Sequence, residues 1–203
     1  MTSRLSQRGR AGIVLANGSM TSQTSGEGEI RKNLITSDLI ECMVDLPGQL
    51  FSNTPIPACL WFLSKDKGSG INGSIDRTGQ VLFIDCRKKG SVQLSRTQIA
   101  FTDEELHAIA LTYHRWRGSD FADGEEYADE PGFCKSASLA EIEKHHYALT
   151  PGRYVGAADM DDDDEAFEDK MAELTARVSE RMARGRELEE EIRERLAGIG
   201  YEV

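Results

Sequence analysis

Two apolar runs joined by a loop of proline, glycine, asparagine and threonine constrain the fold of this chain more than any other feature. The runs cover residues 39–46 and 58–63, and both have the length and composition of β-strands. Pro47 and Gly48 end the first run, and two further prolines restrict the backbone that leads into the second. Loops that are held in this way at strand ends often carry functional residues.

Phe51 lies near the middle of this loop, where a large apolar side chain calls for an explanation. Two interpretations are open from the residues alone. The ring either caps a local hydrophobic cluster, or it faces a binding site built at the strand ends.

The surrounding residues alternate between strand and helix patterns. Residues 11–15 form an apolar run that is closed by Asn17-Gly18, which predicts a buried strand, and residues 81–86 predict another. Residues 29–36 have the apolar spacing of a helix. A strand, a helix and a second strand in this order indicate a crossover connection in an α/β sheet.

A further helix is predicted for residues 102–116, because Thr102 and Glu105 have the spacing of a capping box. A short helix is predicted to begin at Ser138. His107 and His114 lie seven residues apart on the longer helix, but no third ligand accompanies them, so we predict no metal site.

The net charge of −11 is concentrated near the C-terminus. Residues 157–203 carry 16 acidic and 7 basic side chains, a balance of −9, which leaves 19 acidic and 17 basic side chains, or −2, for the rest. Duplex binding depends mainly on cationic contacts to phosphate. The part of the chain before residue 157 is therefore expected to bind DNA poorly by itself. If the protein acts on DNA, most of the cationic contacts must come from elsewhere.

Residues 167–199 have the 4-3-4 apolar spacing that is typical of a coiled coil, and the other faces are almost wholly charged. Four consecutive carboxylates at 161–164 precede this pattern, where they suit a helix N-terminus. One long helix is predicted. Its narrow apolar stripe either folds back on its own domain or pairs with helices of another chain.

The four cysteines are far apart, form no CxxC pair and lie mostly within apolar runs. Such cysteines are typical of reduced, buried thiols in a cytoplasmic protein. No stretch reaches the roughly 18 apolar residues that a membrane helix needs.

Several segments together resemble the C-terminal part of the modification (M) subunit of type I restriction-modification systems. They are GRAGIVLANGSM, EIRKNLI, LIECMVDLPGQLFSNTPIPACLWFLSK, VLFIDCR, ALTPGRYV and a charged helix that ends in LAGIGYEV. This family consists of DNA adenine N6-methyltransferases that use S-adenosylmethionine. The resemblance covers essentially the whole chain, with one departure at Ala16, where the family usually has proline.

The resemblance implies an α/β fold, the distal half of a Rossmann-like methyltransferase sheet followed by a long C-terminal helix. We expect residues 1–90 to form this half-sheet, 91–156 a helical and loop extension, and 157–203 an acidic linker and the amphipathic helix. The family's glycine-rich cofactor motif and its Asn-Pro-Pro-Phe motif are absent from this sequence. We therefore assign no catalytic residue and expect the chain to be inactive alone.

The resemblance also implies roles for particular residues. In related enzymes the loop after this strand stacks an aromatic ring on the flipped adenine, and Phe51 occupies that place, with Asn53 and Thr54 as candidates for the same pocket. The specificity (S) subunit is the implied partner of the long helix, whose contact candidates are Phe167, Met171, Leu174, Val178, Leu188 and Ile192.

Two hypotheses follow from this reading. The chain is either the distal part of a methyltransferase, which an upstream half completes and which then acts on DNA, or a truncated interaction module that docks to a specificity subunit without catalysis. The missing cofactor motif favours no activity in isolation.

Overall fold

The structure is a computed structural model that describes residues 4–52, 54–156 and 167–198. The chain divides into two compact units, Met1–Asp159 and Met160–Val203, which are treated separately below. Within the described ranges, no helix is both long enough and apolar enough to cross a membrane.

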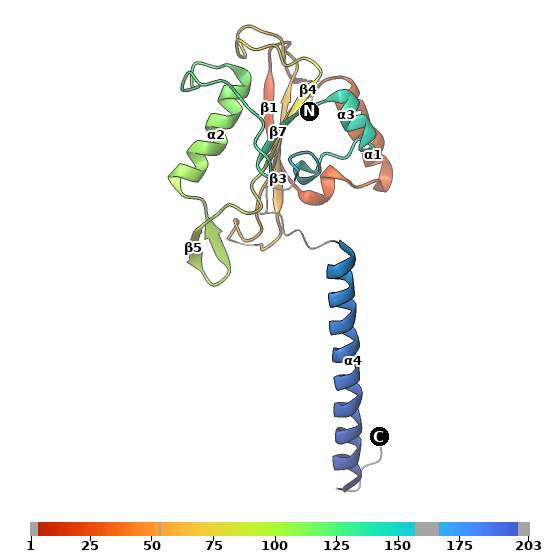
Figure 1. Ribbon diagram of the computed structural model, residues 1–203. Coiled ribbons are helices and arrows are strands. Elements are labelled where there is room, and N and C mark those ends of the chain that lie inside the picture. The colour runs from red at the N-terminus through yellow and green to blue at the C-terminus, as the bar shows by residue number, and fades with distance from the viewer. Residues whose placement is uncertain (1–3, 53, 157–166, 199–203) are drawn as a thin grey trace. The chain divides into compact units, whose positions relative to one another are not determined.

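The first unit is built on a five-stranded mixed sheet in the order β1-β3-β2-β4-β7 (Figure 1). A separate two-stranded hairpin pairs β5 with β6. The strands are β1 (Arg10–Ala16), β2 (Ile40–Asp45), β3 (Ala58–Ser64), β4 (Gln80–Asp85), β5 (Val92–Ser95), β6 (Gln98–Ala100) and β7 (Cys134–Ser138). The helices of this unit are α1 (Glu27–Thr36), α2 (Asp103–Arg117) and α3 (Leu139–Lys144), with short 3-10 turns at Asn17–Met20, Thr24–Gly26 and Pro151–Arg153.

Three strands of this sheet end at the same edge. Both β1 and β2 pair antiparallel with β3, and β2 pairs parallel with β4, so β1, β2 and β4 run in one direction. Asp45 and Asp85 are register partners at the last position of β2 and β4. We call this edge, where β1, β2 and β4 end, the carboxyl edge.

Helices cover both faces of the sheet, with α2 on one side and α1 and α3 on the other (Figure 1). Alternate residues of β2 face opposite layers: Met43 packs in the cluster with Ile35 of α1, whereas Val44 packs in the cluster with Trp116 of α2. The sheet is therefore sandwiched between two apolar layers, as the α/β prediction requires.

The strongest local patterns formed the predicted elements. All six residues of β2 are buried, and the capping box forms as predicted, with the Thr102 side chain accepting from the Glu105 amide and the Glu105 side chain accepting from the Thr102 amide. The N-cap of α3 is Ser138, as expected. The four cysteines are free and buried.

The strand at residues 11–15 was predicted to be buried, and this was wrong for the chain described here. Most of β1 is exposed, because β1 is the edge strand and pairs with β3 alone among the described residues. Residues 91–156 also contain more than the expected helices and loops, since β7 joins the main sheet and β5 and β6 form the hairpin.

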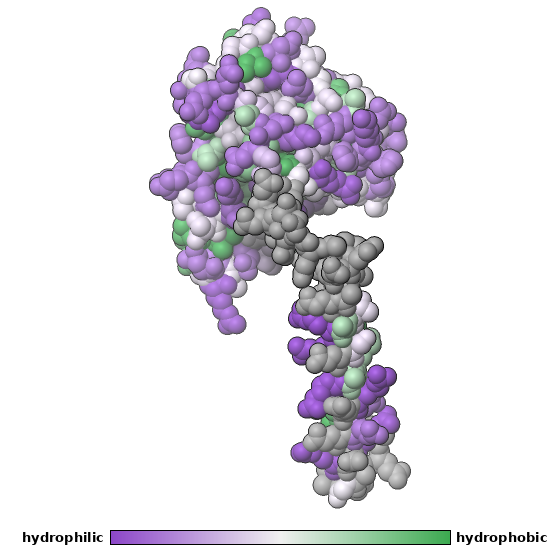
Figure 2. All heavy atoms as spheres, viewed as in Figure 1, coloured by the Kyte–Doolittle hydropathy of each residue, from purple (hydrophilic) through white to green (hydrophobic). Residues whose placement is uncertain are grey.

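The second unit contains α4 (Phe167–Gly198), a helix of 32 residues. Among its coloured atoms, Figure 2 shows hydrophobic residues interspersed with strongly hydrophilic ones. The described apolar side chains of Val178, Leu188 and Ile192 are all exposed. The side chains of Phe167, Met171 and Leu174 lie outside the described part of the structure.

Candidate functional site at the carboxyl edge

Polar side chains follow the ends of three strands and meet at the carboxyl edge. Asn17 comes directly after β1, Asp45 ends β2, and Arg87 lies two residues after β4. They line a cavity of about 540 Å³, together with Gly18, Met20, Thr21, Leu46, Pro47, Gly48, Pro57 and Thr150. Ligands of open α/β sheets bind outside the carboxyl ends of the strands, so the cavity has the expected position of a functional site.

Asp45 is the buried charge of this site, with an exposed fraction of 1%. The Asn17 amide donates a 2.7 Å hydrogen bond from Nδ2 to Asp45 Oδ1, and Nε of Arg87 lies 3.5 Å from Oδ2. Burial raises the pKa of Asp45, against the hydrogen bond from Asn17 and the charge of Arg87, which lower it. Both carboxylate oxygens are thus already engaged by the chain's own residues.

Asp85 holds Arg87 in place beside Asp45. Arg87 donates from Nε to Oδ1 of Asp85 at 3.0 Å and from Nη2 to Oδ2 at 2.6 Å. Burial would raise the pKa of Asp85, but the bonds from Arg87 outweigh it and lower this pKa. The positive charge of the Arg87 guanidinium is therefore balanced by the carboxylates of Asp45 and Asp85, which end neighbouring strands.

The loop that carries Phe51 is closed by backbone hydrogen bonds. Gln49 donates to the Pro55 carbonyl at 3.2 Å, and Thr54 donates to the Phe51 carbonyl at 3.4 Å. Gly48 is required here, because a Cβ atom at this position would lie 2.7 Å from the Pro55 carbonyl oxygen. The loop is thereby folded tightly across the carboxyl edge.

Phe51 itself lies outside both apolar clusters of the described residues, and 40% of the residue is exposed. An exposed ring is compatible with the second interpretation, and the role of Phe51 stays a prediction. Phe51 is not among the residues that line the cavity. Thr54 is half-buried, and its hydroxyl accepts from the Ile56 amide at 3.2 Å, while Asn53 lies outside the described residues.

The described residues do not provide a site that fits S-adenosylmethionine. A cofactor ribose is commonly held by a carboxylate at a strand end, together with a glycine-rich turn at a helix N-terminus. Asp45 is engaged by Asn17 and Arg87, and β1 is followed by a 3-10 turn rather than by a glycine-rich turn into a helix.

Sequence reasoning pointed to Phe51, whose role stays a prediction, and it missed the cluster of Asn17, Asp45 and Arg87. The available signal was a polar residue at or just after the end of each apolar run. Only the parallel direction of β1, β2 and β4 brings these ends together, and that direction is a tertiary property.

A mixed sheet with helices on both faces and a polar site at its carboxyl edge defines a protein of the α/β class. Within this class, the chain belongs to the N-6 DNA Methylase family, which it matches over residues 1–163. The resemblance drawn from the sequence motifs is thereby confirmed.

Related sequences and solved structures agree with this family assignment. The chain is 50% identical over 202 residues to the type I restriction enzyme HindI methylase subunit of Haemophilus influenzae, covering all of this chain and 42% of that protein. It is 36% identical to the MjaIX methylase subunit of Methanocaldococcus jannaschii, covering 95% of this chain and 32% of that protein. The chain thus spans less than half the length of these curated relatives.

Among solved structures, the methyltransferase subunit of a type I restriction-modification system from Streptococcus thermophilus superposes with a TM-score of 0.60. It is 29% identical, and the match covers 77% of this chain and 28% of that one. The mixed sheet with covering helices therefore has the fold of one part of that methyltransferase subunit.

Proposed function

We propose that this chain is the distal portion of a type I modification subunit that transfers a methyl group from S-adenosylmethionine to adenine N6 in DNA. Family membership supports the reaction class. The absence of a fitting cofactor site in the described residues supports a division of labour, in which the upstream portion holds the cofactor. A protein that methylates chromosomal DNA in a bacterium or archaeon works in the cytoplasm.

The observation that carries this proposal is the exposed ring of Phe51, held at the carboxyl edge by a closed loop. A base that leaves the duplex loses its stacking, and an aromatic face restores part of it. Phe51 is the stacking platform for the target adenine. Asn53 and Thr54 shape the same pocket, and the bond of Thr54 to the Ile56 amide supports a role in holding the loop.

The test combines cofactor binding with methylation. Calorimetry with S-adenosylmethionine is performed on the chain alone and after an upstream portion is supplied in trans. We expect no binding alone, and both binding and adenine methylation after assembly with a specificity subunit. Cofactor binding by the chain alone would contradict the division of labour.

Phe51→Ala tests the platform in the assembled enzyme. Stacking on an aromatic ring contributes about 1–3 kcal/mol, so methylation should fall by about 5- to 150-fold, while Phe51→Trp should retain activity. Phe121→Ala is the matched control, because Phe121 is also an exposed phenylalanine of the first unit, at 79%. An equal loss in both alanine variants would contradict the role of Phe51.

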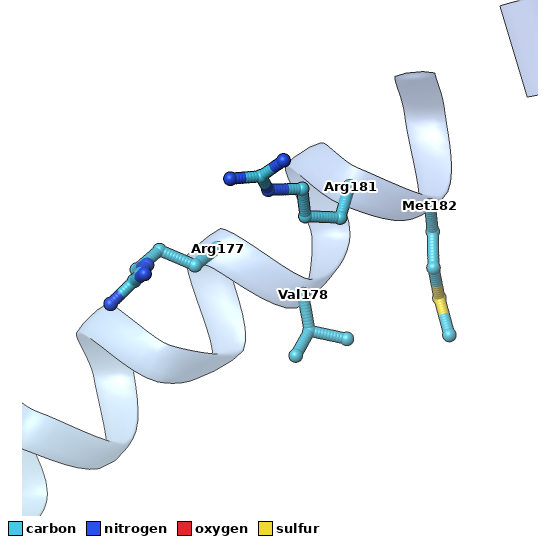
Figure 3. Close-up of a pocket in the computed structure, with 4 residues that line it drawn as sticks. All are labelled: Arg177, Val178, Arg181 and Met182. Carbon is cyan, nitrogen blue, oxygen red and sulfur yellow. The ribbon is translucent and has the colours of Figure 1, made fainter. Parts of the chain in front are cut away.

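A second candidate function is that of an interaction module without catalysis, and the exposed side chains of α4 favour it. Val178 and Met182 lie one turn apart and are 53% and 65% exposed. Figure 3 shows them projecting to one side of the helix, while Arg177 and Arg181 project to another. Packing against another helix would bury the apolar face of such an amphipathic helix and stabilise it.

In both candidates α4 docks to the helices of the specificity subunit. The proposed contact residues are Phe167, Met171, Leu174, Val178, Leu188 and Ile192. Leu188→Ser with Ile192→Ser should weaken binding to that subunit in a titration calorimetry experiment, whereas Glu189→Ser with Arg193→Ser, a neighbouring i,i+4 ion pair, should not. Docking that persists without methylation in the completed assembly would favour the non-catalytic module.

A further inference from the structure

Residues 86–102 have a charge pattern that is unlike the rest of this acidic chain. The segment contains Arg87, Lys88, Lys89 and Arg96 and has no aspartate or glutamate, in a chain whose net charge is −11. It comprises the turn after β4 and the β5–β6 hairpin. A local excess of cations in such a chain marks a candidate surface for an anionic partner.

The segment lies beside the loop that carries Phe51. The Ile99 amide of β6 donates a 3.0 Å hydrogen bond to the Gln49 carbonyl, two residues before Phe51. The Cys86 amide donates to the Asp45 carbonyl at 2.8 Å, which fixes the start of the basic turn at the carboxyl edge. In Figure 1 the hairpin extends beyond the end of the sheet at this edge.

Three of the four cations make no salt bridge within the described residues. Arg87 is shared by Asp45 and Asp85, but Lys88, Lys89 and Arg96 are not so engaged. Lys88 and Arg96 are exposed, and the half-buried Lys89 places Nζ 4.8 Å from the centroid of the Phe133 ring.

One acidic side chain of α2, Glu105, accepts hydrogen bonds from the backbone of this segment. Glu105 of α2 accepts from the Gly90 amide at 3.0 Å and from the Ser91 amide at 3.4 Å. Its carboxylate therefore holds the turn in shape by hydrogen bonds to the backbone rather than by an ion pair with a lysine.

We propose that Lys88, Lys89 and Arg96 contact the phosphates of DNA next to the nucleotide whose base stacks on Phe51. This inference rests on the proposed function and adds a sequence-independent contact surface to it. Contacts to phosphate set the position of a protein on a duplex without reading its sequence.

The test uses the whole chain and needs no methylation. A short duplex of mixed sequence is titrated into the isotope-labelled chain at low salt, and amide chemical shifts are recorded by nuclear magnetic resonance. We expect weak binding, with the largest shifts in residues 87–100 and in the Phe51 loop. Absence of shifts in these segments, or larger shifts confined to α4, where a protein partner is proposed, would overturn the inference.

The charge dependence is tested with a matched pair of triple variants. Lys88→Gln, Lys89→Gln and Arg96→Gln together should reduce the slope of log Kd against log salt by about 2.7, since each phosphate contact contributes about 0.9. The control replaces three other lysines of the first unit by glutamine, Lys32, Lys65 and Lys144. Both triples change the net charge equally, so equal slopes in the two would contradict a local contact surface.

This outcome is separable from that of the proposed function. If the basic triple binds duplex like the unmodified chain while Phe51→Ala lowers methylation in the assembly as expected, the phosphate contacts are wrong and the methyltransferase function stands. If the shifts map to residues 87–100 and the assembly methylates nothing, the contact surface stands and the catalytic function is wrong.

Discussion

Arg77 and Glu41 form an ion pair in the interior of the first unit, with Nη1 of Arg77 2.5 Å from Oε1 of Glu41 and each side chain only 1% exposed. The Tyr113 hydroxyl donates to the other carboxylate oxygen at 2.8 Å. These bonds join β2 to the irregular segment before β4 and to α2, so a loop of glycine-rich composition is fixed to the sheet by buried polar groups.

Replacement of one partner of this pair is expected to destabilise the fold strongly. Arg77→Met leaves the buried Glu41 carboxylate with only a distant cation, because Nε of Arg117 lies 3.9 Å from Oε1, and the loss of one partner of a buried pair costs about 3–5 kcal/mol. The double variant Arg77→Met with Glu41→Leu should be the more stable of the two, because the poorly paired carboxylate is gone while Arg117 keeps its 2.8 Å hydrogen bond to the Asn72 carbonyl. Urea unfolding measures both, and a double variant less stable than the single one would contradict this account.

As pH rises, the carboxylates of Asp45 and Asp85 at the carboxyl edge should change the free energy of unfolding in opposite directions. Burial raises the pKa of Asp45, so the unfolded chain loses this proton first and stability falls as pH rises from about 4 through the folded value. The Asp45→Asn variant has no carboxylate to titrate at this position. In thermal melts, its melting temperature relative to that of the unmodified chain should therefore rise over this pH range.

Asp85→Asn is the counterpart of this measurement. Arg87 lowers the pKa of Asp85 despite its burial, so its stabilisation is present above about pH 4 and is lost as pH falls through the folded value. The variant should therefore be less stable than the unmodified chain at neutral pH and approach it in acid. The same pH trend in both variants would show that one of the two assignments is wrong.

The capping box of α2 should contribute measurable stability. Thr102 accepts from the Glu105 amide at 3.1 Å, and Thr102→Ala should cost about 1 kcal/mol in urea unfolding. Thr112→Ala is the control, because the half-buried Thr112 hydroxyl only donates back to the Ala108 carbonyl within the helix. That change should be nearly neutral, and a comparable loss in both would rule out a specific cap.

Gly48→Ala should disturb the Phe51 loop without unfolding the sheet. The added methyl group would lie 2.7 Å from the Pro55 carbonyl oxygen, which is closer than Cβ atoms approach oxygen, so the loop must open. Hydrogen exchange should accelerate at the Gln49 and Thr54 amides. Gly68→Ala tests a glycine with room for a methyl group, whose nearest neighbour would be Oδ1 of Asp66 at 3.5 Å, and it should leave exchange in the Phe51 loop unchanged.

Local sequence patterns determined much of the first unit. The continuous apolar run at 39–46 gave a strand whose six residues are buried, and the Thr102 and Glu105 pair set the start of α2. Prolines and Gly48 marked the loop that carries Phe51, because ring constraints and turn chemistry act over a few residues. Motif order along the chain was also enough for the family resemblance.

Other features were decided only by the tertiary structure. The run at 11–15 has the composition of a buried strand, yet β1 is largely exposed, because burial depends on which strands lie beside it. The short strands β5, β6 and β7 carry little apolar periodicity, and they form through pairing with partners distant in sequence or through a local hairpin. The cluster of Asn17, Asp45 and Arg87 exists because three parallel strands end together, whereas sequence encodes each residue only beside its own neighbours.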